Sequence, residues 1–279
     1  MNTLILWKDE HTTIFCSALY ETTSSVVVTD DCVIVVDPNW LPHEIEEIKR
    51  YVDEVREDRV IYLLFTHSDY DHIIGYRAFP DALVIASGAF NRKSLIDKEQ
   101  IIEEIKIFDD NYYISRNYEV VYPKVDHIID GDGTSIQIGQ TKLTFFQAQG
   151  HNDDGLFTII EPIGIFFCGD YFSDIEFPYI YFSSHEYEKT ILKLDDIISH
   201  FDIKLLVTGH GNPTKDRTEM KKRQQDSLEY IVKMRQYVLT NNKEAIVQLI
   251  NGCKYPRNMK KTHHNNTLLM EKERIESKK

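Results

Sequence analysis

The sequence has no run of apolar residues long enough to span a membrane. Its first residues, MNTLILWKDEH, lack the basic region, long apolar stretch and small-residue cleavage site of a secretion signal. These absences predict a soluble, cytoplasmic protein with no membrane partner. Cysteine is also scarce, and the cysteines are widely separated in the sequence. They therefore lack the paired spacing that is typical of a zinc ribbon, a redox motif or a disulfide framework. We expect four reduced cysteines that mostly pack in the interior: Cys16, Cys32, Cys168 and Cys253.

Positive charge is in short supply as well. The formal net charge of -13 argues against a protein whose main task is to cover nucleic-acid phosphates or anionic lipid. Nucleic acid is therefore not an expected partner. The exception is local, because residues 254–279 carry eight Lys or Arg against three Glu. We interpret this segment as a solvated, partly helical tail, with a phosphate-binding patch as the alternative.

No repeat, low-complexity tract or Pro/Gly-rich linker divides the chain. A length of 279 residues with 42% hydrophobic content is enough for one large domain with its own core. We predict one domain over residues 1–240. A helical, basic tail over residues 241–279 is expected to pack on this domain or to extend from it.

The spacing of apolar residues predicts alternating strands and helices. In the segment 41–58, Ile45, Ile48, Val52 and Val55 recur every three or four residues, which is typical of an amphipathic helix. That helix leads into an apolar strand at 59–65, which we expect to be buried on both faces. The same patterns predict hairpins at 24–38, 134–151 and 156–170, strands at 82–87 and 203–211, and helices at 93–108, 186–200 and 217–238.

Four predicted strands end in a His or Asp beside Gly or a polar loop, in the stretches FTHSDYDH, AQGHNDDG, FCGDYF and VTGHG. A single His at a strand end is more often a hydrogen-bonded histidine than a ligand, and Asp before Gly is more often a turn residue. The joint occurrence, in order, indicates a metal-binding framework instead. Strand ends bring distant side chains to one rim, and seven imidazole or carboxylate groups suffice for two metal ions: His67, Asp69, Asp71, His72, His151, Asp170 and His210.

These stretches resemble, in order, the motifs of the metallo-β-lactamase superfamily, over about residues 15–238. THSDYDH is similar to the family's Thr-His-x-His-x-Asp-His motif. AQGHNDDG resembles the third motif, CGD the fourth and TGHG the fifth, and Asp37 in VIVVDP is similar to the structural aspartate of the first. The resemblance implies a four-layer αββα sandwich, in which two sheets pack together with helices outside and a dinuclear metal site lies at one edge.

The resemblance also implies a ligand set for two divalent metal ions, with zinc as the first choice and iron or manganese as alternatives. One ion would be held by His67, Asp69 and His151, the other by Asp71, His72 and His210, and Asp170 would bridge the two.

Asp69 departs from the family pattern, because it stands where the second histidine is expected. With two divalent ions and a bridging hydroxide, the formal charge of the site falls from +1 to zero, which favours harder ions such as iron or manganese. Flavodiiron proteins of the same superfamily carry a glutamate here, but they are joined to a flavodoxin module, for which the residues after Val238 are too few. The alternative is that Asp69 lies outside the coordination sphere and one metal binds weakly.

Two adjacent metal ions suit hydrolysis, since they generate hydroxide at neutral pH and polarise a carbonyl or phosphoryl oxygen. We therefore predict an enzyme, a metallo-hydrolase that uses a dinuclear centre and a bridging hydroxide to cleave a small ester, lactone or thioester. The alternatives are a diiron redox enzyme with a separate reductase, a phosphodiester hydrolase and a catalytically silent, metal-stabilised binding domain. Only forty positions separate Asp170 from His210, which disfavours the nucleases that carry a domain inserted there. The motifs leave the substrate and the oligomeric state open.

Two residues are predicted to act directly in the chemistry. Asp71 belongs to the ligand cluster, and Tyr171 follows Asp170 and would donate a hydrogen bond to an oxyanion or leaving group. Tyr179 and Tyr181 are alternatives for this donor. We expect the aromatic stretches 111–118 and 171–187 to wall a pocket for a small, partly apolar substrate. The adjacent tail histidines, His263 and His264, are expected to be solvated and are not included in the site.

Overall fold

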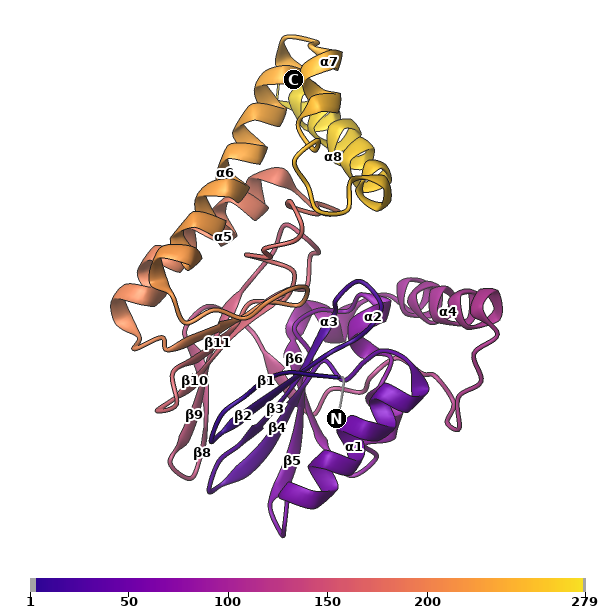
Figure 1. Ribbon diagram of the computed structural model, residues 1–279, viewed down its shortest axis with the longest axis vertical. Coiled ribbons are helices and arrows are strands. Elements are labelled where there is room, and N and C mark those ends of the chain that lie inside the picture. The colour runs from indigo at the N-terminus through magenta and orange to yellow at the C-terminus, as the bar shows by residue number, and fades with distance from the viewer. Residues whose placement is uncertain (1–3, 278–279) are drawn as a thin grey trace.

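The computed structural model describes residues 4–277 and contains two β-sheets packed face to face (Figure 1). The first sheet has seven strands, in the order β1-β2-β3-β4-β5-β6-β7, and the second has five, in the order β12-β11-β10-β9-β8. The first comprises β1 (Ile5–Lys8), β2 (Thr12–Cys16), β3 (Thr23–Val28), β4 (Cys32–Val36), β5 (Val60–Leu64), β6 (Leu83–Ser87) and β7 (His127–Ile129). The second comprises β8 (Thr134–Ile138), β9 (Thr141–Gln147), β10 (Leu156–Glu161), β11 (Ile165–Phe167) and β12 (Leu205–Val207).

Helices cover the outer face of each sheet (Figure 1). The first sheet is covered by α1 (Pro42–Val55), α3 (Gly88–Arg92) and α4 (Leu95–Tyr112), and the second by α5 (Ser184–His200) and α6 (Arg217–Leu239). The remaining elements are α2 (Tyr70–Ile73), the short 3-10 helix Tyr76–Ala78, α7 (Lys243–Gln248) and α8 (Pro256–Glu276). The layers are those of the predicted αββα sandwich, and the predicted hairpins, strands and longer helices are confirmed with small shifts at their ends.

Three apolar clusters hold the layers together. Between the sheets, side chains such as Ile34, Leu64 and Phe145 are fully buried. On the outer face of the first sheet, α1 buries Ile45 as part of the stripe that the sequence predicted. The outer face of the second sheet packs on α5 and α6, where Leu194 is fully buried. Each such side chain contributes about 1.5–3 kcal/mol relative to an exposed one.

The direction of the strands brings one set of strand ends to a single edge. In the first sheet β4, β5, β6 and β7 are parallel. In the second, β10 is antiparallel to β9 and β11, and β11 is parallel to β12, so β9, β11 and β12 run the same way. Two hydrogen bonds join the sheets at this edge, from Leu156 N–H to the Thr66 carbonyl and from Thr23 N–H to the Gly209 carbonyl, each 2.7 Å long.

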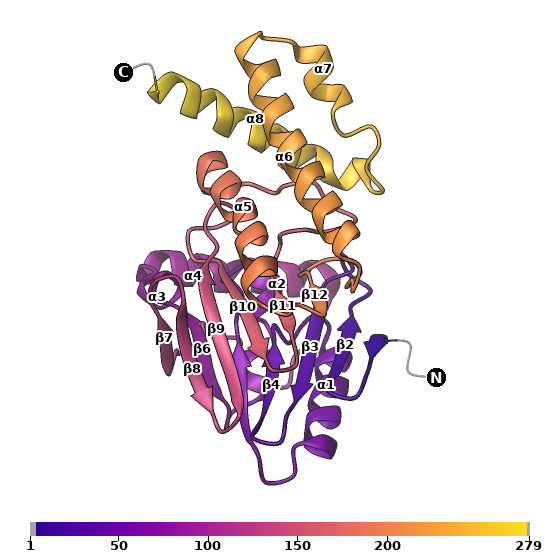
Figure 2. The ribbon, with the colours of Figure 1, turned by 90° about the vertical axis from the view of Figure 1, so that its left-hand side faces the viewer.

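The C-terminal helices lie beyond this edge of the sandwich (Figure 2). The prediction of a solvated tail is wrong for one face of α8, which buries Met259, His263, Asn266, Thr267 and Met270. These positions recur at helical spacing, but three of them are polar. The buried face of α8 therefore cannot be recognised in the sequence from a pattern of apolar residues. The domain boundary at residue 240 stays a prediction, and the outermost residues of both predicted segments, 1–3 and 278–279, lie outside the described residues.

Within residues 4–277, no helix combines the length and apolar character that crossing a bilayer requires. All four cysteines are free, and Cys32 and Cys168 are buried as expected.

Candidate metal centre

All seven predicted ligands lie at the edge where the strand ends meet. His67 follows β5, and Asp69, Asp71 and His72 lie at or in the adjoining α2, whereas the other three follow strands of the second sheet. Their donor atoms form two groups in which every atom lies within 4.8 Å of the others. The first group is His67, Asp69, His151 and Asp170, and the second is Asp71, His72 and His210.

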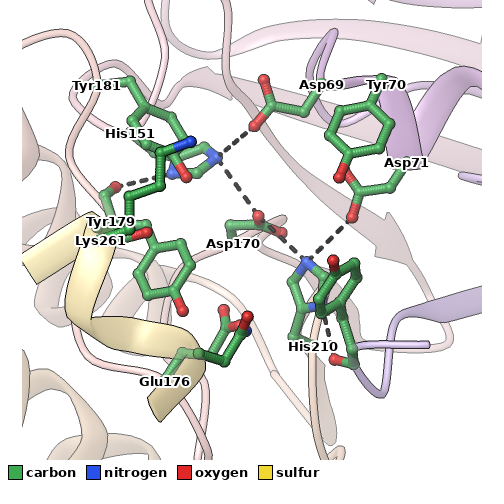
Figure 3. A pocket seen from close by; sticks show the side chains of 13 residues that line it. Asp69, Tyr70, Asp71, His151, Asp170, Glu176, Tyr179, Tyr181, His210 and Lys261 are labelled. Atoms are coloured by element: carbon green, nitrogen blue, oxygen red, sulfur yellow. Dashed lines mark hydrogen bonds and ion pairs between the residues drawn. The ribbon is translucent and has the colours of Figure 1, made fainter. Parts of the chain in front are cut away.

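Asp170 lies between the two groups (Figure 3). Its Oδ2 is 3.3 Å from Nε2 of His151 and 3.3 Å from Nε2 of His210, and its Oδ1 is 3.2 Å from Nε2 of His72. Two ligands of one tetrahedral ion, each about 2.1 Å from the metal, are about 3.4 Å apart. The spacing around Asp170 therefore matches ligands that share metal ions.

The histidine rings are oriented by hydrogen bonds on their Nδ1 side. His151 Nδ1 lies 2.8 Å from the Tyr179 carbonyl and His210 Nδ1 lies 3.0 Å from the Tyr20 carbonyl. Because a carbonyl only accepts, each Nδ1 carries the proton and donates it. When such a ring is neutral, its unprotonated Nε2 faces the shared space, which is how proteins orient metal-binding histidines.

Asp37 orients two further candidate ligands, His72 and His67, through hydrogen bonds. It follows β4 with a positive φ of 45°, and its Oδ2 lies 2.9 Å from Nδ1 of His72. The same carboxylate accepts from Thr66, with 2.9 Å to the backbone N–H and 2.6 Å to the hydroxyl. The Thr66 oxygen lies 3.0 Å from Nδ1 of His67. Asp37 thus holds His72 directly and His67 through Thr66.

Several buried atoms at this edge have no hydrogen-bond partner among residues 4–277. They include Nε2 of His67, Nε2 of His72 and Oδ1 of Asp170; the last two lie 3.2 Å apart but without the geometry of a hydrogen bond. Leaving a buried polar group unpaired costs about 1–3 kcal/mol, so such atoms normally bind something. Because all three point into one space lined by imidazole and carboxylate groups, the residues fit divalent metal ions.

Asp69 divides its two oxygens between different neighbours. Its Oδ1 accepts a 2.6 Å hydrogen bond from the side-chain amide of Asn152. Its Oδ2 lies 3.1 Å from Nε2 of His151 and 3.6 Å from Nε2 of His67. One oxygen of Asp69 is therefore next to His67 and His151, the two histidines that the family resemblance assigns to the same metal ion. Asn152 was not predicted, although it directly follows His151 in the motif.

The charges of this cluster shift its pKa values strongly. Burial acts to raise the pKa of the Asp170 carboxyl, but His210, His72 and His67 outweigh burial and hold that pKa well below its ordinary value. Burial acts to lower the pKa of His151, but Asp69 and Asp170 raise it to about 9. Burial acts likewise on His210, and Asp170 and Glu176 raise its pKa to about 10. Without metal ions, protonated histidines neutralise the carboxylates.

A glycine allows neighbouring strand ends to approach each other at the centre. A Cβ atom on Gly209 would lie 2.2 Å from Oδ1 of Asp170 and 3.0 Å from Cε1 of His72. Any other residue at this position would displace the Asp170 carboxylate. Gly209, in the motif VTGHG, is therefore required by the close contact between neighbouring strand ends.

Tyr171 does not have the geometry that the sequence prediction assumed. Its side chain is buried, and its hydroxyl accepts a 2.9 Å hydrogen bond from the His151 N–H and donates a 3.0 Å bond to the Ala148 carbonyl. The direct donor role predicted for Tyr171 does not fit, because the backbone already engages its hydroxyl. Its contacts position the loop that carries His151.

A pocket of about 260 Å³ opens over the cluster (Figure 3). The size suits a small substrate. The hydroxyl of Tyr179 is buried there without a hydrogen-bond partner among residues 4–277. Burial raises the pKa of the Glu176 carboxyl in this pocket to about 7. The lining residues are Tyr20, Asp69, Tyr70, Asp71, His151, Asp170, Glu176, Tyr179, Tyr181, His210, Asn258, Lys261 and Thr262.

Several residues that line this pocket were not predicted to do so, Tyr20 and Tyr70 among them. Glu176 lies in the stretch 171–187, which was expected to wall the pocket. The prediction rested on the aromatic residues of that stretch and gave Glu176 no role. Asn258, Lys261 and Thr262 come from α8, in the tail that was expected to be solvated. Their spacing of three and four residues places them on one helix face. The sequence does not indicate which part of the structure that face contacts. The predicted aromatic wall is present in part, in Tyr179 and Tyr181.

The family model of the metallo-beta-lactamase superfamily matches residues 19–210, and the chain belongs to this superfamily. Its members are in general hydrolytic enzymes that bind divalent metal ions. The recognised resemblance and the fold class are thereby confirmed. No curated protein matches the chain in sequence.

Solved structures share the fold at low sequence identity. A metallo-beta-lactamase family protein from Thermus thermophilus is 16% identical with a TM-score of 0.66, covering 95% of this chain and 92% of its own. A metallo-beta-lactamase from Pontibacter korlensis is 16% identical with a TM-score of 0.56, covering 81% and 98%. A stereoselective inverting sec-alkylsulfatase from a Pseudomonas species is 12% identical with a TM-score of 0.62, covering 86% of this chain but 43% of its own. The fold alone therefore leaves the substrate open.

Proposed function

We propose that this chain is a metal-dependent hydrolase that cleaves a small ester, lactone or thioester at a dinuclear centre. The observation that carries the proposal is the set of buried, unpartnered atoms of His67, His72 and Asp170, which face two compact groups of imidazole and carboxylate donors. A pocket of about 260 Å³ opens over these groups, which a hydrolase requires and a catalytically silent, metal-stabilised domain does not.

The proposed ligand roles follow the two groups. His67, Asp69 and His151 would hold one ion and Asp71, His72 and His210 the other. Asp170 would serve both, because its Oδ2 lies 3.3 Å from Nε2 of His151 and 3.3 Å from Nε2 of His210. Two divalent ions bound there supply a nucleophilic hydroxide near neutral pH and polarise the oxygen of the scissile group.

The protein's own groups then act on the substrate and its protons. Tyr179 donates a hydrogen bond to the oxygen on which negative charge develops, because its hydroxyl faces the pocket unpaired. Asp71 lines the pocket 3.5 Å from Nε2 of His210. It would take up a proton from the attacking water and return it to the oxygen or sulfur that leaves when the bond to the acyl carbon breaks. Tyr171 acts through the loop that it holds and does not touch the substrate.

The proposal is tested by loading the purified protein with zinc, manganese or iron and measuring hydrolysis of a panel of esters, lactones and thioesters. Asp170→Ala is expected to lose both ions together and all metal-dependent activity, because one carboxylate serves both ions. Asp30→Ala is the control, since this exposed carboxylate lies in the turn between β3 and β4, outside the lining of the pocket. Activity that does not depend on metal, or an Asp170→Ala protein that keeps two bound ions, would contradict the proposal.

A diiron redox enzyme is the second candidate, and the position of Asp69 favours it. Its Oδ2 atom, 3.1 Å from Nε2 of His151, adds a third carboxylate to the cluster, and oxygen ligands suit iron better than zinc. Metal analysis of natively expressed protein separates the two candidates. Oxygen-sensitive iron with electron transfer from a reductase supports the second, whereas zinc or manganese with hydrolysis supports the first.

A further inference from the structure

The family match ends at residue 210, but one wall of the pocket comes from α8, more than forty residues later in the chain. This wall consists of Asn258, Lys261 and Thr262 on one face of the helix. Two of these side chains carry neutral hydrogen-bonding groups, and Lys261 carries a positive charge. These three residues of the pocket wall therefore lie outside the part of the chain that the family model matches.

The position of α8 against the pocket is held by specific contacts. Asn266 donates a 2.7 Å hydrogen bond to the Pro178 carbonyl, and its side-chain oxygen accepts from the Ile180 N–H at 3.1 Å. About two turns further on, the Glu273 carboxylate accepts from the Ser184 N–H at 2.9 Å. Because these contacts join α8 to the loop that carries Tyr179 and Tyr181, the α8 wall is built into the pocket.

Lys261 is the one Lys or Arg among the residues that line this pocket within the described chain. Two other lysines of the C-terminal segment, Lys254 and Lys272, form ion pairs with Glu21 and Glu276. For Lys261, no carboxylate of residues 4–277 lies within ion-pair distance, although it lies over an acidic site. Its ammonium group is therefore available to a ligand.

The position of Lys261 keeps its ammonium group apart from the carboxylate of Glu176. In Figure 3 its side chain runs towards Tyr181 and His151, and Glu176 lies well away from the ammonium group. The remaining carboxylates, Asp69, Asp71 and Asp170, are assigned to the metal ions. With three carboxylates, two divalent ions and a hydroxide, the centre itself has no net charge to attract an anion.

We propose that Lys261 on α8 binds a singly charged anionic group, such as a carboxylate, at the end of the substrate that is remote from the scissile bond. This inference rests on the proposed hydrolase function for the location of the scissile bond. One ammonium group balances one negative charge, whereas a phosphate dianion would leave one negative charge unbalanced in a pocket that is already lined by carboxylates. The substrate class is therefore an ester, lactone or thioester that carries a second, anionic group.

Direct binding to the metal-loaded protein tests the inference without requiring hydrolysis. The probes are succinate, glutarate and adipate, each compared by calorimetry with the monocarboxylate of equal carbon number. One carboxylate of each probe would take the place of the hydroxide at the metal centre, and the second would reach Lys261 in the chain of suitable length. We expect at least one dicarboxylate to bind about tenfold more tightly than its monocarboxylate, the value of one charge-assisted hydrogen bond.

Lys261→Ala should abolish that tenfold difference and leave monocarboxylate binding unchanged. Lys260→Ala is the matched control, because Lys260 is the preceding exposed lysine of α8 and does not line the pocket. It should keep the difference. Equal binding of both kinds of acid by the unmodified protein, or a difference that survives Lys261→Ala, would overturn the inference.

A second measurement separates failure of this inference from failure of the proposed function. With 4-nitrophenyl hydrogen glutarate and the neutral 4-nitrophenyl butyrate, Lys261→Ala is expected to raise KM about tenfold for the anionic ester only. If neither ester, nor any other in the panel, is hydrolysed, the hydrolase proposal fails while the binding comparison still decides the role of Lys261. If both esters are hydrolysed and Lys261→Ala affects them equally, the role of Lys261 is refuted and the hydrolase remains.

Discussion

The side-chain amide of Asn266 in α8 donates a 2.7 Å hydrogen bond to the carbonyl of Pro178, which lies 88 residues earlier in the chain. The same side chain accepts from the N–H of Ile180, and the carbonyl between them, that of Tyr179, accepts from Nδ1 of His151. A fully buried amide of the helix α8 is thus joined to His151, a histidine of the candidate metal centre, through three consecutive loop residues.

Asn266→Ala should therefore reduce both stability and metal affinity. The substitution leaves the Ile180 N–H and the Pro178 carbonyl buried without a partner, which should lower the free energy of unfolding by about 2–4 kcal/mol. Urea unfolding of the metal-free protein measures this. Asn265→Ala, at the adjacent exposed position, should change stability by less than about 0.5 kcal/mol. Equal urea midpoints for the two variants would show that the buried amide does not anchor the loop.

Gly209→Ala tests the close approach at the centre. The new Cβ would lie 2.2 Å from Oδ1 of Asp170, so the carboxylate must move away from its position between the two ligand groups. We expect loss of bound metal, measured by elemental analysis after dialysis, with the helical circular dichroism signal retained. A Cβ on Gly252 would meet nothing within 4 Å, so Gly252→Ala should bind metal normally. Full metal occupancy in the Gly209 variant would argue that Asp170 is not a ligand.

Metal binding should release protons and should strengthen as pH rises. The pKa of His151 is raised to about 9 and that of His210 to about 10, and both rings must lose a proton before Nε2 can bind an ion. At pH 8, calorimetry in two buffers of different ionisation enthalpy should therefore detect about two protons released. Binding with no proton release would contradict the paired arrangement of these histidines with Asp69 and Asp170.

The same pKa shifts give the metal-free protein the opposite pH dependence of stability. A histidine whose pKa is raised on folding stabilises the protein fully below its unfolded pKa of about 6.5. That contribution is lost as pH increases through the folded values of about 9 and about 10. Unfolding of the metal-free protein should thus become easier from pH 7 to pH 10, while saturating metal should remove this trend.

Asp69→His should shift the metal preference towards zinc. The substitution removes one negative charge and supplies an imidazole, which zinc accepts more readily than iron or manganese do. It also removes the 2.6 Å hydrogen bond from Asn152, so the measured quantity is the ratio of metals bound in competition and not total occupancy. An unchanged ratio, in an experiment where Asp71→Ala and His67→Ala both alter metal content, would show that Asp69 is not a ligand.

Much of the fold was predictable because its elements are locally encoded. The spacing of Ile45, Ile48 and Val52 predicted α1, and all three side chains are buried on the first sheet. The residues after β5, β9, β11 and β12 were predicted as one metal site because each motif is contiguous and the motifs occur in the order that a known superfamily shares. The short strand β1 and the buried face of α8 were not predicted, since neither has a clear period of apolar residues.

The roles of individual side chains depended on packing that motif position does not describe. Tyr171 follows Asp170 directly, yet its hydroxyl is turned to the backbone at Ala148 and His151. His263 was expected to be solvated, yet Nδ1 lies 2.9 Å from the Tyr230 hydroxyl and Nε2 lies 2.7 Å from the Ile246 carbonyl. Hydrogen bonds to backbone and to distant helices have no fixed spacing in the chain.

The sequence by itself determined the superfamily, the layered fold and the imidazole and carboxylate groups of the centre, because each depends on residues that are close together or on the direction of strands. Only the tertiary structure determined which segments of the chain line the pocket over this centre. It placed Lys261 of α8 over ligands that lie between about 50 and 190 residues earlier, beyond the reach of any local pattern. A pocket wall forms from whichever segments pack at a strand edge, and that packing is the sum of many long-range contacts across the whole chain.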